Sequence, residues 1–288
     1  MKRIIILVPV FNDWESLKRL LQEINKNIKN FKNIVVDCFI VNDASTIKQP
    51  KMEKPDLINL IKIFNMKKNQ GHARCNAFGI KYIFEQEEFD NLIVMDGDGE
   101  DRPQEIKDLI NQSIKDPNKS IVAKRIKRSE GLFFQLLYKF HKLLTLFFTG
   151  QNINFGNFTC LTKADVGVLS TRGSLWNSFS GTLKKNIKYF NEINSIRGLR
   201  YYGPSKMRFS QLILHSLSII SVFKYQVFFR SLLIFFLLSL LNNFIGALSL
   251  ILQFLLIIFN FIIFVISLRE KKIDLINSQN NLRDIKEI

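Results

Sequence analysis

Short apolar runs that alternate with helical segments constrain the fold of this chain more than any other feature. The runs are short and rich in Ile and Val, which is typical of buried strands. Near-continuous apolar strands fit a parallel sheet covered on both faces, and alternation with helices indicates an α/β fold. The predicted strands are Ile4–Val10, Val35–Val41, Ile58–Phe64, Leu92–Met95 and Ser120–Ala123, with later strands at Phe158–Leu161 and Ile187–Ile193. Helices are predicted from Trp14 to Ile28, from the segment Asn69–Arg74 to about Phe84, and from Pro103 onward.

Acidic residues follow three of these strands. Asp13 comes after the first strand, Asp43 after the second, and Asp96 and Asp98 after the fourth. In parallel α/β sheets, ligands bind outside the carboxyl ends of the strands. We therefore expect these acids, distant in sequence, to gather at one edge of the sheet and form a binding site there.

The segment Asp96-Gly97-Asp98 has the character of a metal and phosphate site. Residues i and i+2 of an extended chain point to the same side, so the two carboxylates project together. Gly97 and Gly99 let a ligand approach the backbone. Oxygen ligands without Cys or His suit Mg²⁺ or Mn²⁺, with Asp96, Asp98 and Glu100 as the expected ligands.

This segment has two other interpretations. A solvated acidic turn is the simplest alternative for an isolated pair of aspartates, and the segment alone leaves it open. An EF-hand is excluded, because Asp101 stands where that loop needs Gly and Lys107 where it needs Glu.

The composition of the chain limits the classes of molecule that it is expected to bind. The 288-residue chain has a formal net charge of +16, which fits nucleic acid, anionic lipid or phosphorylated substrates. No RNA-binding signature or zinc-finger spacing occurs, so nucleic acid is not expected as a partner. Cys38, Cys75 and Cys160 are far apart and predict neither a disulfide framework nor a zinc site. The turn after the first strand lacks GxGxxG, which argues against a dinucleotide-binding fold.

The C-terminal third carries a membrane signal. Ser231–Leu268 has no charge and as one helix would be roughly 57 Å long at about 1.5 Å per residue, against a hydrocarbon core of about 30 Å. Two transmembrane helices in a tight hairpin are predicted instead, with a turn near Asn242–Ser249. Arg230 and Arg269 flank the run, which predicts that both ends are cytoplasmic in a multi-pass protein of the cell (inner) membrane.

Two further apolar segments are expected at the membrane surface. Leu132–Phe148 is interrupted by charges and is interpreted as an interfacial helix or a cover for the sheet. Met207–Phe229 is interpreted as a juxtamembrane amphipathic segment. The predicted units are a catalytic domain at 1–206, the juxtamembrane segment at 207–229, two transmembrane helices at 230–268 and a charged, weakly ordered cytoplasmic tail at 269–288.

Several motifs together resemble a known family. PVFND after the first strand, NDAS after the second, NQGHARCNA before the next helix and DGDGEDRPQE after the fourth strand look like family-2 glycosyltransferases of the GT-A fold. The branch that they resemble is the dolichyl- or polyprenyl-phosphate sugar synthases, which often carry C-terminal membrane helices. The resemblance covers roughly residues 1 to 210. The chain has Asn42-Asp43 where the family more often has Asp-Asp, and DGDGE where it more often has DADxQ.

The resemblance implies roles for individual residues. In the family, the positions matching Pro9, Phe11 and Asp13 line the nucleotide pocket, and the one matching Asp43 contacts the base. Those matching Asp96 and Asp98 handle the metal and the diphosphate. Arg125 stands where the family often has an arginine that faces phosphate, and Arg74 is assigned to the same nucleotide-sugar site. The simpler alternatives are a solvated basic loop for Arg125 and a surface helix position for Arg74.

The segment Arg197–Lys206 resembles the Arg-rich strand and Gly-x-Ser-Lys motif of the family. Arg200 and Lys206 are therefore expected to act with Asp98 in transfer by holding phosphate. A surface basic strand is the simpler alternative. His72 is expected to be a loop residue.

The expected activity is transfer of a sugar, with inversion, from a nucleotide-diphosphate sugar to a polyprenyl phosphate, such as dolichyl or undecaprenyl phosphate. A phosphate acceptor needs no strong general base, and between Gly150 and Leu183 only Asp165 offers a carboxylate, at an expected helix start. Transfer to a growing glycan and a non-enzymatic membrane scaffold are the alternatives. A homo-oligomer is left open.

Overall fold

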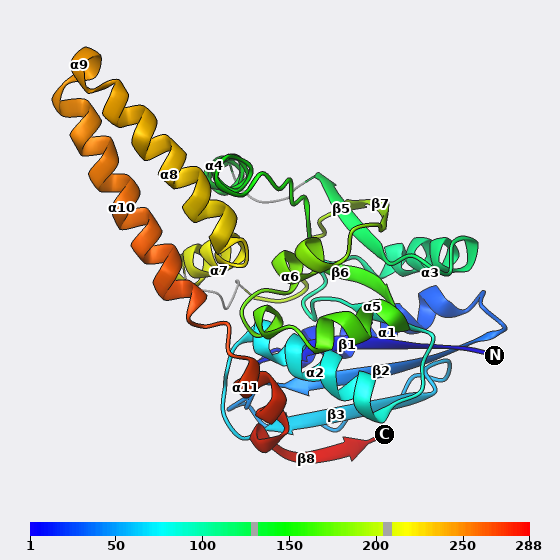
Figure 1. The fold of residues 1–288 in the computed structure, drawn as a ribbon. Coiled ribbons are helices and arrows are strands. Elements are labelled where there is room, and N and C mark those ends of the chain that lie inside the picture. Colours follow the sequence, from blue (N-terminus) through cyan, green and yellow to red (C-terminus); the bar gives the residue numbers. More distant parts are fainter. Residues whose placement is uncertain (128–131, 204–208) are drawn as a thin grey trace.

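The computed structural model describes residues 1–127, 132–203 and 209–288. A single sheet of eight strands lies at the centre of this part of the chain, with helices on both faces (Figure 1). The strand order is β7-β5-β6-β4-β1-β2-β3-β8. The strands are β1 (Lys2–Val10), β2 (Ile34–Asn42), β3 (Leu60–Met66), β4 (Asn91–Val94), β5 (Ile121–Lys127), β6 (Phe155–Thr162), β7 (Asn191–Ile196) and β8 (Leu282–Glu287).

Helices connect these strands and continue beyond them. The sheet domain contains α1 (Trp14–Ile28), α2 (His72–Gln86), α3 (Ile106–Lys115), α5 (Lys163–Ser170) and α6 (Phe179–Asn186), with the short helices η1 (Pro103–Glu105) and η2 (Gly173–Trp176). The remaining helices are α4 (Leu132–Thr149), α7 (Phe209–Ser221), α8 (Lys224–Leu240), α9 (Asn242–Ile245), α10 (Ala247–Ser267), α11 (Lys272–Ile276) and η3 (Asn277–Asn281).

The α/β prediction is confirmed, and the sheet is mixed rather than uniformly parallel. β1 pairs in parallel with β2 and β4, and β2 pairs in parallel with β3. β6 runs antiparallel to both β4 and β5, and β8 runs antiparallel to β3. The strands with acids at their carboxyl ends thus form the parallel centre, which brings those ends to one edge.

Two hydrophobic clusters cover the two faces of the sheet. Alternate residues of a strand point to opposite faces. Ile4, Ile6 and Val8 accordingly join the cluster beneath α1 and α3, whereas Ile5 and Leu7 join the cluster beneath α2, α5 and α6. All five are fully buried. This explains why the first strand has no polar face, as the sequence predicted.

Later segments differ from the prediction in two places. A strand was expected at Ile187–Ile193, but Ile187 follows the end of α6, so β7 begins only at Asn191. The Arg-rich segment was expected to be a strand, but residues 197–203 form a loop that follows β7. Hydrogen bonds to the loop after β4 hold it, as described below.

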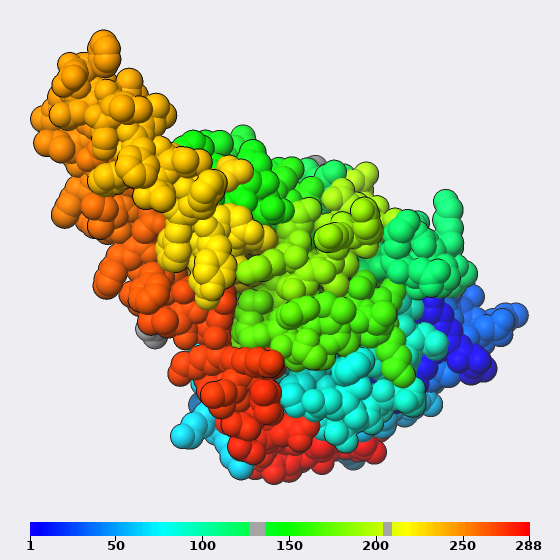
Figure 2. Space-filling model, in the orientation of Figure 1, coloured from blue at the N-terminus to red at the C-terminus, as the bar shows by residue number. Residues whose placement is uncertain are grey.

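Helices α8 and α10 form a hairpin with α9 at its tip, and this hairpin projects from the sheet domain (Figures 1 and 2). The predicted turn near Asn242–Ser249 therefore lies where expected. A third hydrophobic cluster joins α4, α7, α8 and α10 at the base of the hairpin and is centred on Phe148, Ile220 and Val227. Within the described residues, one helix, beginning at Ala247, is by itself long and apolar enough to cross a membrane.

The expectation of a weakly ordered tail at 269–288 is wrong. The chain returns from the hairpin through α11 to β8, which pairs with β3 at the edge of the sheet. Ile61 and Ile288 exchange backbone hydrogen bonds of 3.1 and 2.9 Å, and Asn65 Nδ2 donates to Asp284 Oδ1 at 2.5 Å. The C-terminal residues thus belong to the sheet domain, and both ends of the hairpin are attached to it.

Candidate active site

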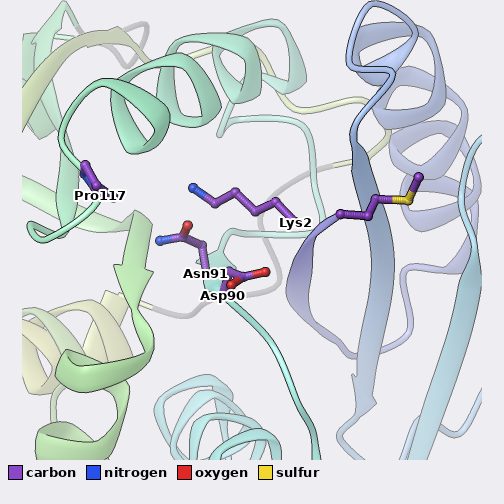
Figure 3. A pocket seen from close by; sticks show the side chains of 5 residues that line it. Lys2, Asp90, Asn91 and Pro117 are labelled. Carbon is purple, nitrogen blue, oxygen red and sulfur yellow. The ribbon is translucent and has the colours of Figure 1, made fainter.

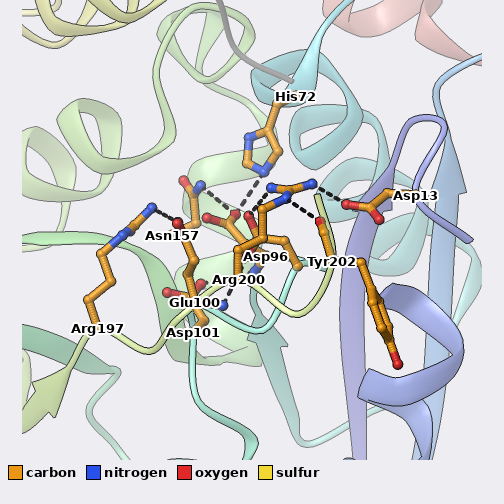
Figure 4. A network of polar contacts seen from close by, with 10 residues as sticks. Asp13, His72, Asp96, Glu100, Asp101, Asn157, Arg197, Arg200 and Tyr202 are labelled. Carbon is orange, nitrogen blue, oxygen red and sulfur yellow. Dashed lines mark hydrogen bonds and ion pairs between the residues drawn. The ribbon is translucent and has the colours of Figure 1, made fainter. Parts of the chain in front are cut away.

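The acids predicted from the sequence meet at the carboxyl edge of the parallel strands (Figure 4). Asp13 follows β1, and Asp96 and Asp98 follow β4. Arginines from the loop after β7 and His72 from the start of α2 surround them. The site is therefore a partly buried cluster of acids in which each carboxylate has a basic or amide partner.

Asp96 is held by a histidine and an asparagine. Its Oδ1 accepts hydrogen bonds from His72 Nε2 at 2.8 Å and from Asn157 Nδ2 at 3.1 Å. Burial raises the pKa of Asp96, but the charges of His72, Arg197 and Arg125 lower it by more. The pKa of Asp96 therefore lies well below its usual value. Asp96 is ionised at neutral pH, and its orientation is fixed before any ligand binds.

His72 was expected to be a loop residue, and that expectation is wrong. It begins α2 and contacts the first acid of the Asp96-Gly97-Asp98 segment. Burial lowers the pKa of His72, but Asp96, Asp98 and Asp101 raise it more, so its pKa lies above the usual value. Because the contact joins residues 24 positions apart, only the folded structure shows it.

Arg200 bridges two of the predicted acids. Its Nη1 donates to Asp98 Oδ2 at 2.7 Å, and its Nη2 forms an ion pair with Asp13 Oδ2. Burial and the neighbouring charge of Asp96 raise the pKa of Asp98. The structure thus brings together three residues that the sequence assigned to one site, from segments more than 180 positions apart.

The loop at residues 197–203 is attached to the loop after β4. Gly198 N donates to Glu100 O at 2.8 Å, and Tyr201 N donates to Asp98 O at 2.9 Å. Gly99 has a φ of +89°, and an added Cβ would lie 2.6 Å from the Tyr201 ring. Glycine is required here both by the backbone conformation and by the close approach of that ring.

Asp101 and Arg125 form a second layer beneath the site. Asp101 Oδ2 accepts from Asp96 N at 2.9 Å, and Arg125 Nη2 lies 3.6 Å from Asp101 Oδ1. Burial and the charge of Asp96 raise the pKa of Asp101 to about 7. Sequence reasoning missed Asp101 as a site residue, although its place in the acidic run DGDGED was a signal. Arg125 is mostly buried against Asp101, and its expected role in facing phosphate stays a prediction.

Asp43 is buried and positions the segment that opens α2. Its Oδ1 and Oδ2 accept hydrogen bonds of 2.8 Å from the backbone N–H groups of Gln70 and Gly71. Burial raises the pKa of Asp43, and these hydrogen bonds lower it in part. The geometry assigns Asp43 a structural role at the edge of the site, and its expected contact with a base stays a prediction.

The turn after β1 is held by a residue that sequence reasoning did not single out. Asn12 has a φ of +52°, and its Oδ1 accepts from the backbone N–H groups of Thr46 and Ile47. This joins the loops after β1 and β2. Pro9 is buried within β1, with its carbonyl 3.2 Å from a Cβ added at Gly97, and Phe11 is 38% exposed.

Arg74 and Lys206 are the other basic residues predicted for the site. Arg74 Nη1 donates to Gln70 O at 3.1 Å, and its guanidinium lies 5.7 Å from the centre of the Trp176 ring. Its contacts are thus with the entrance of α2 and with η2, and its expected role at the nucleotide stays a prediction. Lys206 lies outside the described residues.

The carboxylates at the site fit a metal ion that is held mainly by the phosphates of a bound substrate. Among residues 1–127, 132–203 and 209–288, no group of three or more His, Cys, Asp and Glu side chains is arranged to hold a metal ion. The predicted set of three carboxylates is not gathered, because Glu100 forms an ion pair with Arg197. Asp96 and Asp98 remain, and Mg²⁺ is commonly held by one or two carboxylates together with substrate phosphates and water.

A hollow elsewhere on the surface is not the site. Met1, Lys2, Asp90, Asn91 and Pro117 line it (Figure 3). It lies at the amino ends of β1 and β4, opposite the acids, and Lys2 Nζ is bonded to Ser113. Ligands of parallel α/β sheets bind at the other edge.

Comparison with protein families identifies the class. Residues 5–179 match the model of glycosyl transferase family 2. The match covers more than half of the chain and includes Asp13, Asp43, Asp96 and Asp98. The chain belongs to glycosyl transferase family 2.

Individual relatives are more distant. An uncharacterized protein of Methanocaldococcus jannaschii is 27% identical over 122 residues, which cover 41% of this chain. The chain thus spans about half the length of that relative, since the match covers 49% of it.

Two solved structures are similar to this chain. Glucosyl-3-phosphoglycerate synthase from Mycobacterium tuberculosis, in complex with Mn²⁺, UDP-glucose and phosphoglyceric acid, has a TM-score of 0.53 at 10% identity, covering 78% of this chain and 80% of that one. TarS residues 1–349 from S. aureus have a TM-score of 0.45 at 13% identity, covering 85% and 72%. At 10% identity, the likeness to glucosyl-3-phosphoglycerate synthase shows a shared fold and nothing more.

Proposed function

We propose that this protein transfers a sugar from a nucleotide-diphosphate sugar to a polyprenyl phosphate at the cytoplasmic face of the cell membrane. The donor class is supported by membership of glycosyl transferase family 2 and by the acids at the carboxyl edge of the sheet. A structural neighbour of the same fold was crystallised with Mn²⁺ and UDP-glucose. The base and the sugar are left unspecified.

The chain's own residues would act chiefly by orientation and charge. A divalent cation, Mg²⁺ or Mn²⁺, would neutralise the leaving nucleoside diphosphate, with Asp96 and Asp98 as its protein ligands. His72 and Asn157 keep Asp96 ionised and oriented. Arg200 pairs with Asp98 and Asp13. When the donor binds, the guanidinium of Arg200 would exchange these contacts for hydrogen bonds to the diphosphate oxygens. The acceptor would attack the opposite face of the anomeric carbon, which inverts the configuration.

One observation carries the lipid acceptor. Asn157 of β6 donates to Asp96 at 3.1 Å, β6 follows α4 along the chain, and Phe148 of α4 packs against Phe259 of α10. A short segment thus links the acid cluster to the apolar helices at the base of the hairpin, where a lipid phosphate would arrive. Basic residues at the base of the hairpin favour anionic lipid on the same side as the catalytic domain.

The geometry of Asp165 adds support for an anionic acceptor. This carboxylate accepts a hydrogen bond from Ser120 Oγ at the amino end of β5, and its backbone N–H donates to Thr162 Oγ1 at the start of α5. It is thus engaged away from the acid cluster. A sugar hydroxyl would need a general base, whereas a phosphate acceptor is already anionic.

The direct test is transfer itself. Membranes containing the protein are incubated with a panel of radiolabelled nucleotide sugars, Mg²⁺ or Mn²⁺, and added polyprenyl phosphate. We expect label to enter the organic phase and to depend on both metal and lipid phosphate. Label in a water-soluble or polymeric glycan instead would favour a glycan acceptor. If nucleotide binds equally well with and without metal and no sugar is transferred, the result would favour a non-enzymatic scaffold protein.

Replacement of Arg200 tests the phosphate role. A charge-assisted contact is worth roughly 1.5–3 kcal/mol, so Arg200→Ala should lower kcat/KM about ten- to hundredfold. Arg200→Lys should restore activity only in part, because a point charge cannot replace a bidentate guanidinium. Arg283→Ala on exposed β8 removes the same charge and should leave the rate unchanged. Wild-type kcat/KM in Arg200→Ala at subsaturating substrates would contradict this role.

A further inference from the structure

The helical hairpin presents apolar side chains to its surroundings on both arms. Leu233, Phe236 and Leu240 of α8, and Leu250 and Phe254 of α10, are each more than half exposed. The hairpin stands clear of the sheet domain (Figure 2). Large exposed apolar surfaces of this kind mark sites that another apolar phase covers.

Helix α4 marks the level of the membrane surface on this hairpin. It is seen end-on where α8 and α10 run along the picture, so it lies across them (Figure 1). Leu136, Phe140, Leu143 and Phe147 form an exposed stripe along α4 at helical spacing, with the exposed Lys139 beside it. An amphipathic helix with a basic flank lies in the plane of the membrane interface.

Two contacts fix where α4 meets the hairpin. Arg230 Nη1 of α8 donates to Phe147 O at 2.9 Å, at the C-terminal end of α4. On the other arm, the rings of Phe148 and Phe259 have centroids 4.4 Å apart. Arg230 and Phe259 therefore mark the same level on the two arms, and this level carries the last charge before the tip.

The length beyond that level is short. At about 1.5 Å per residue, the arm from Arg230 to Leu240 rises about 15 Å, and the arm from Phe259 back to Ala247 about 18 Å. The hydrocarbon core of a bilayer is about 30 Å thick. A hairpin that starts at an interfacial α4 ends inside the bilayer, roughly 12 Å short of the opposite surface.

We propose that the α8–α10 hairpin enters the bilayer from the side of the catalytic domain and ends within it, so that the protein is held in the membrane without crossing it. This inference rests on the membrane attachment proposed above and specifies its depth. It replaces the two complete spans expected from the sequence. The occupant of the apolar surface is the lipid of the bilayer, with anionic headgroups at the level of Arg230.

The polar groups of the hairpin fit this environment. Ser249 Oγ donates to Leu238 O at 2.6 Å, and Gln253 Nε2 donates to Ser239 Oγ at 2.9 Å, so these groups are satisfied between the two arms. Such pairing is required in hydrocarbon, where water is absent. Asn242 and Asn243 at the tip are exposed, and their cost is offset by the many apolar side chains that the two arms bury in lipid.

Single cysteines at the tip and on the sheet domain test the depth. Asn243→Cys places a thiol at the tip, and Tyr189→Cys places one on a 78% exposed residue before β7. The native cysteines are buried, so the unmodified protein gives the background. Sealed vesicles of both orientations are treated with a membrane-impermeant maleimide, with and without detergent.

The proposal expects no labelling of Asn243→Cys in either orientation until detergent is added, whereas Tyr189→Cys is labelled whenever the catalytic domain faces outward. Labelling of the tip from the opposite side would show a spanning hairpin and overturn the depth alone. Labelling of both thiols from the same side without detergent would show a hairpin outside the membrane and overturn the attachment as well.

A tryptophan at the tip gives an independent measurement. Phe244 is 84% exposed, and Phe244→Trp should be quenched most strongly by lipids brominated near the ends of the acyl chains. The wild-type protein, whose Trp14 and Trp176 are buried in the sheet domain, is the control for background quenching. Strongest quenching by bromines near the headgroups would overturn the proposed depth.

Discussion

Asp98→Asn is expected to reduce sugar transfer by at least about 100-fold while leaving the protein folded. A metal clamp on a leaving phosphate contributes several kcal/mol, and each 1.4 kcal/mol is about tenfold in rate. Asp98 lies beside Asp96 and pairs with Arg200, at the point where strand β4 and the cationic loop meet. The amide cannot supply the charge that both a cation and Arg200 would use.

The stability of this variant should change little. Burial and the charge of Asp96 already disfavour the ionised form of Asp98, so a neutral amide removes that cost while the Arg200 ion pair is lost. The amide oxygen can still accept from Glu100 N, which Asp98 Oδ1 does at 3.0 Å. Thermal unfolding and metal-dependent transfer are measured together, with Asp56→Asn, an exposed loop acid, as the matched control. Near-normal turnover that still requires metal would contradict the assignment.

The central part of the fold could be predicted because its signals are local. Each of the parallel strands is a short apolar run that ends in polar residues. A strand that is buried on both faces needs apolar side chains at nearly every position, so it is visible in the sequence. Helix α1 was predicted with its observed bounds, Trp14–Ile28. The position of Asp13, Asp96 and Asp98 at one edge then followed from the parallel topology alone.

The partners of those acids could not be predicted in the same way. His72 and Asn157 reach Asp96 through tertiary packing, and no short-range pattern in the sequence announces a contact across 24 residues or more. The loop at 197–203 was interpreted as a strand because Arg197–Lys206 resembles the Arg-rich strand of the family. Its geometry is set instead by hydrogen bonds to Glu100 and Asp98, which the sequence does not encode locally.

Strand β8 shows the limit of composition-based reasoning. Its sequence, LRDIKE, is mostly charged and resembles a solvated tail. Charged residues are nevertheless what edge strands commonly carry, since they discourage further strand pairing. Leu275 of α11 is 1% exposed and belongs to the core cluster on the α2 face. The last residues therefore belong to the sheet domain, which determines how the helical hairpin can be removed experimentally.

Excising the hairpin while keeping β8 is expected to release the protein from membranes. Residues 229–262 can be replaced by a Gly–Ser linker of about four to six residues, which spans the roughly 8–10 Å between packed helices. Each Leu, Ile or Phe that enters lipid contributes roughly 1.5–3 kcal/mol, against about 1 kcal/mol for each basic residue near an anionic surface. The excised segment exposes more than a dozen such side chains, whereas α4 offers only a few, so the hairpin should dominate the attachment.

Fractionation after a high-salt wash measures the outcome, and the retained structure decides how it is interpreted. The excised protein should appear in the soluble fraction, unfold cooperatively and still bind nucleoside diphosphate, because α11 and β8 remain in place. Truncation after Phe223 is the contrasting variant. It removes the same hairpin but also Leu275 and the partner of β3, so it should lose stability as well as membrane attachment. If the excised protein stays wholly in the membrane fraction after the wash, α4 and α7 are sufficient anchors, and the apolar surface of the hairpin serves another purpose.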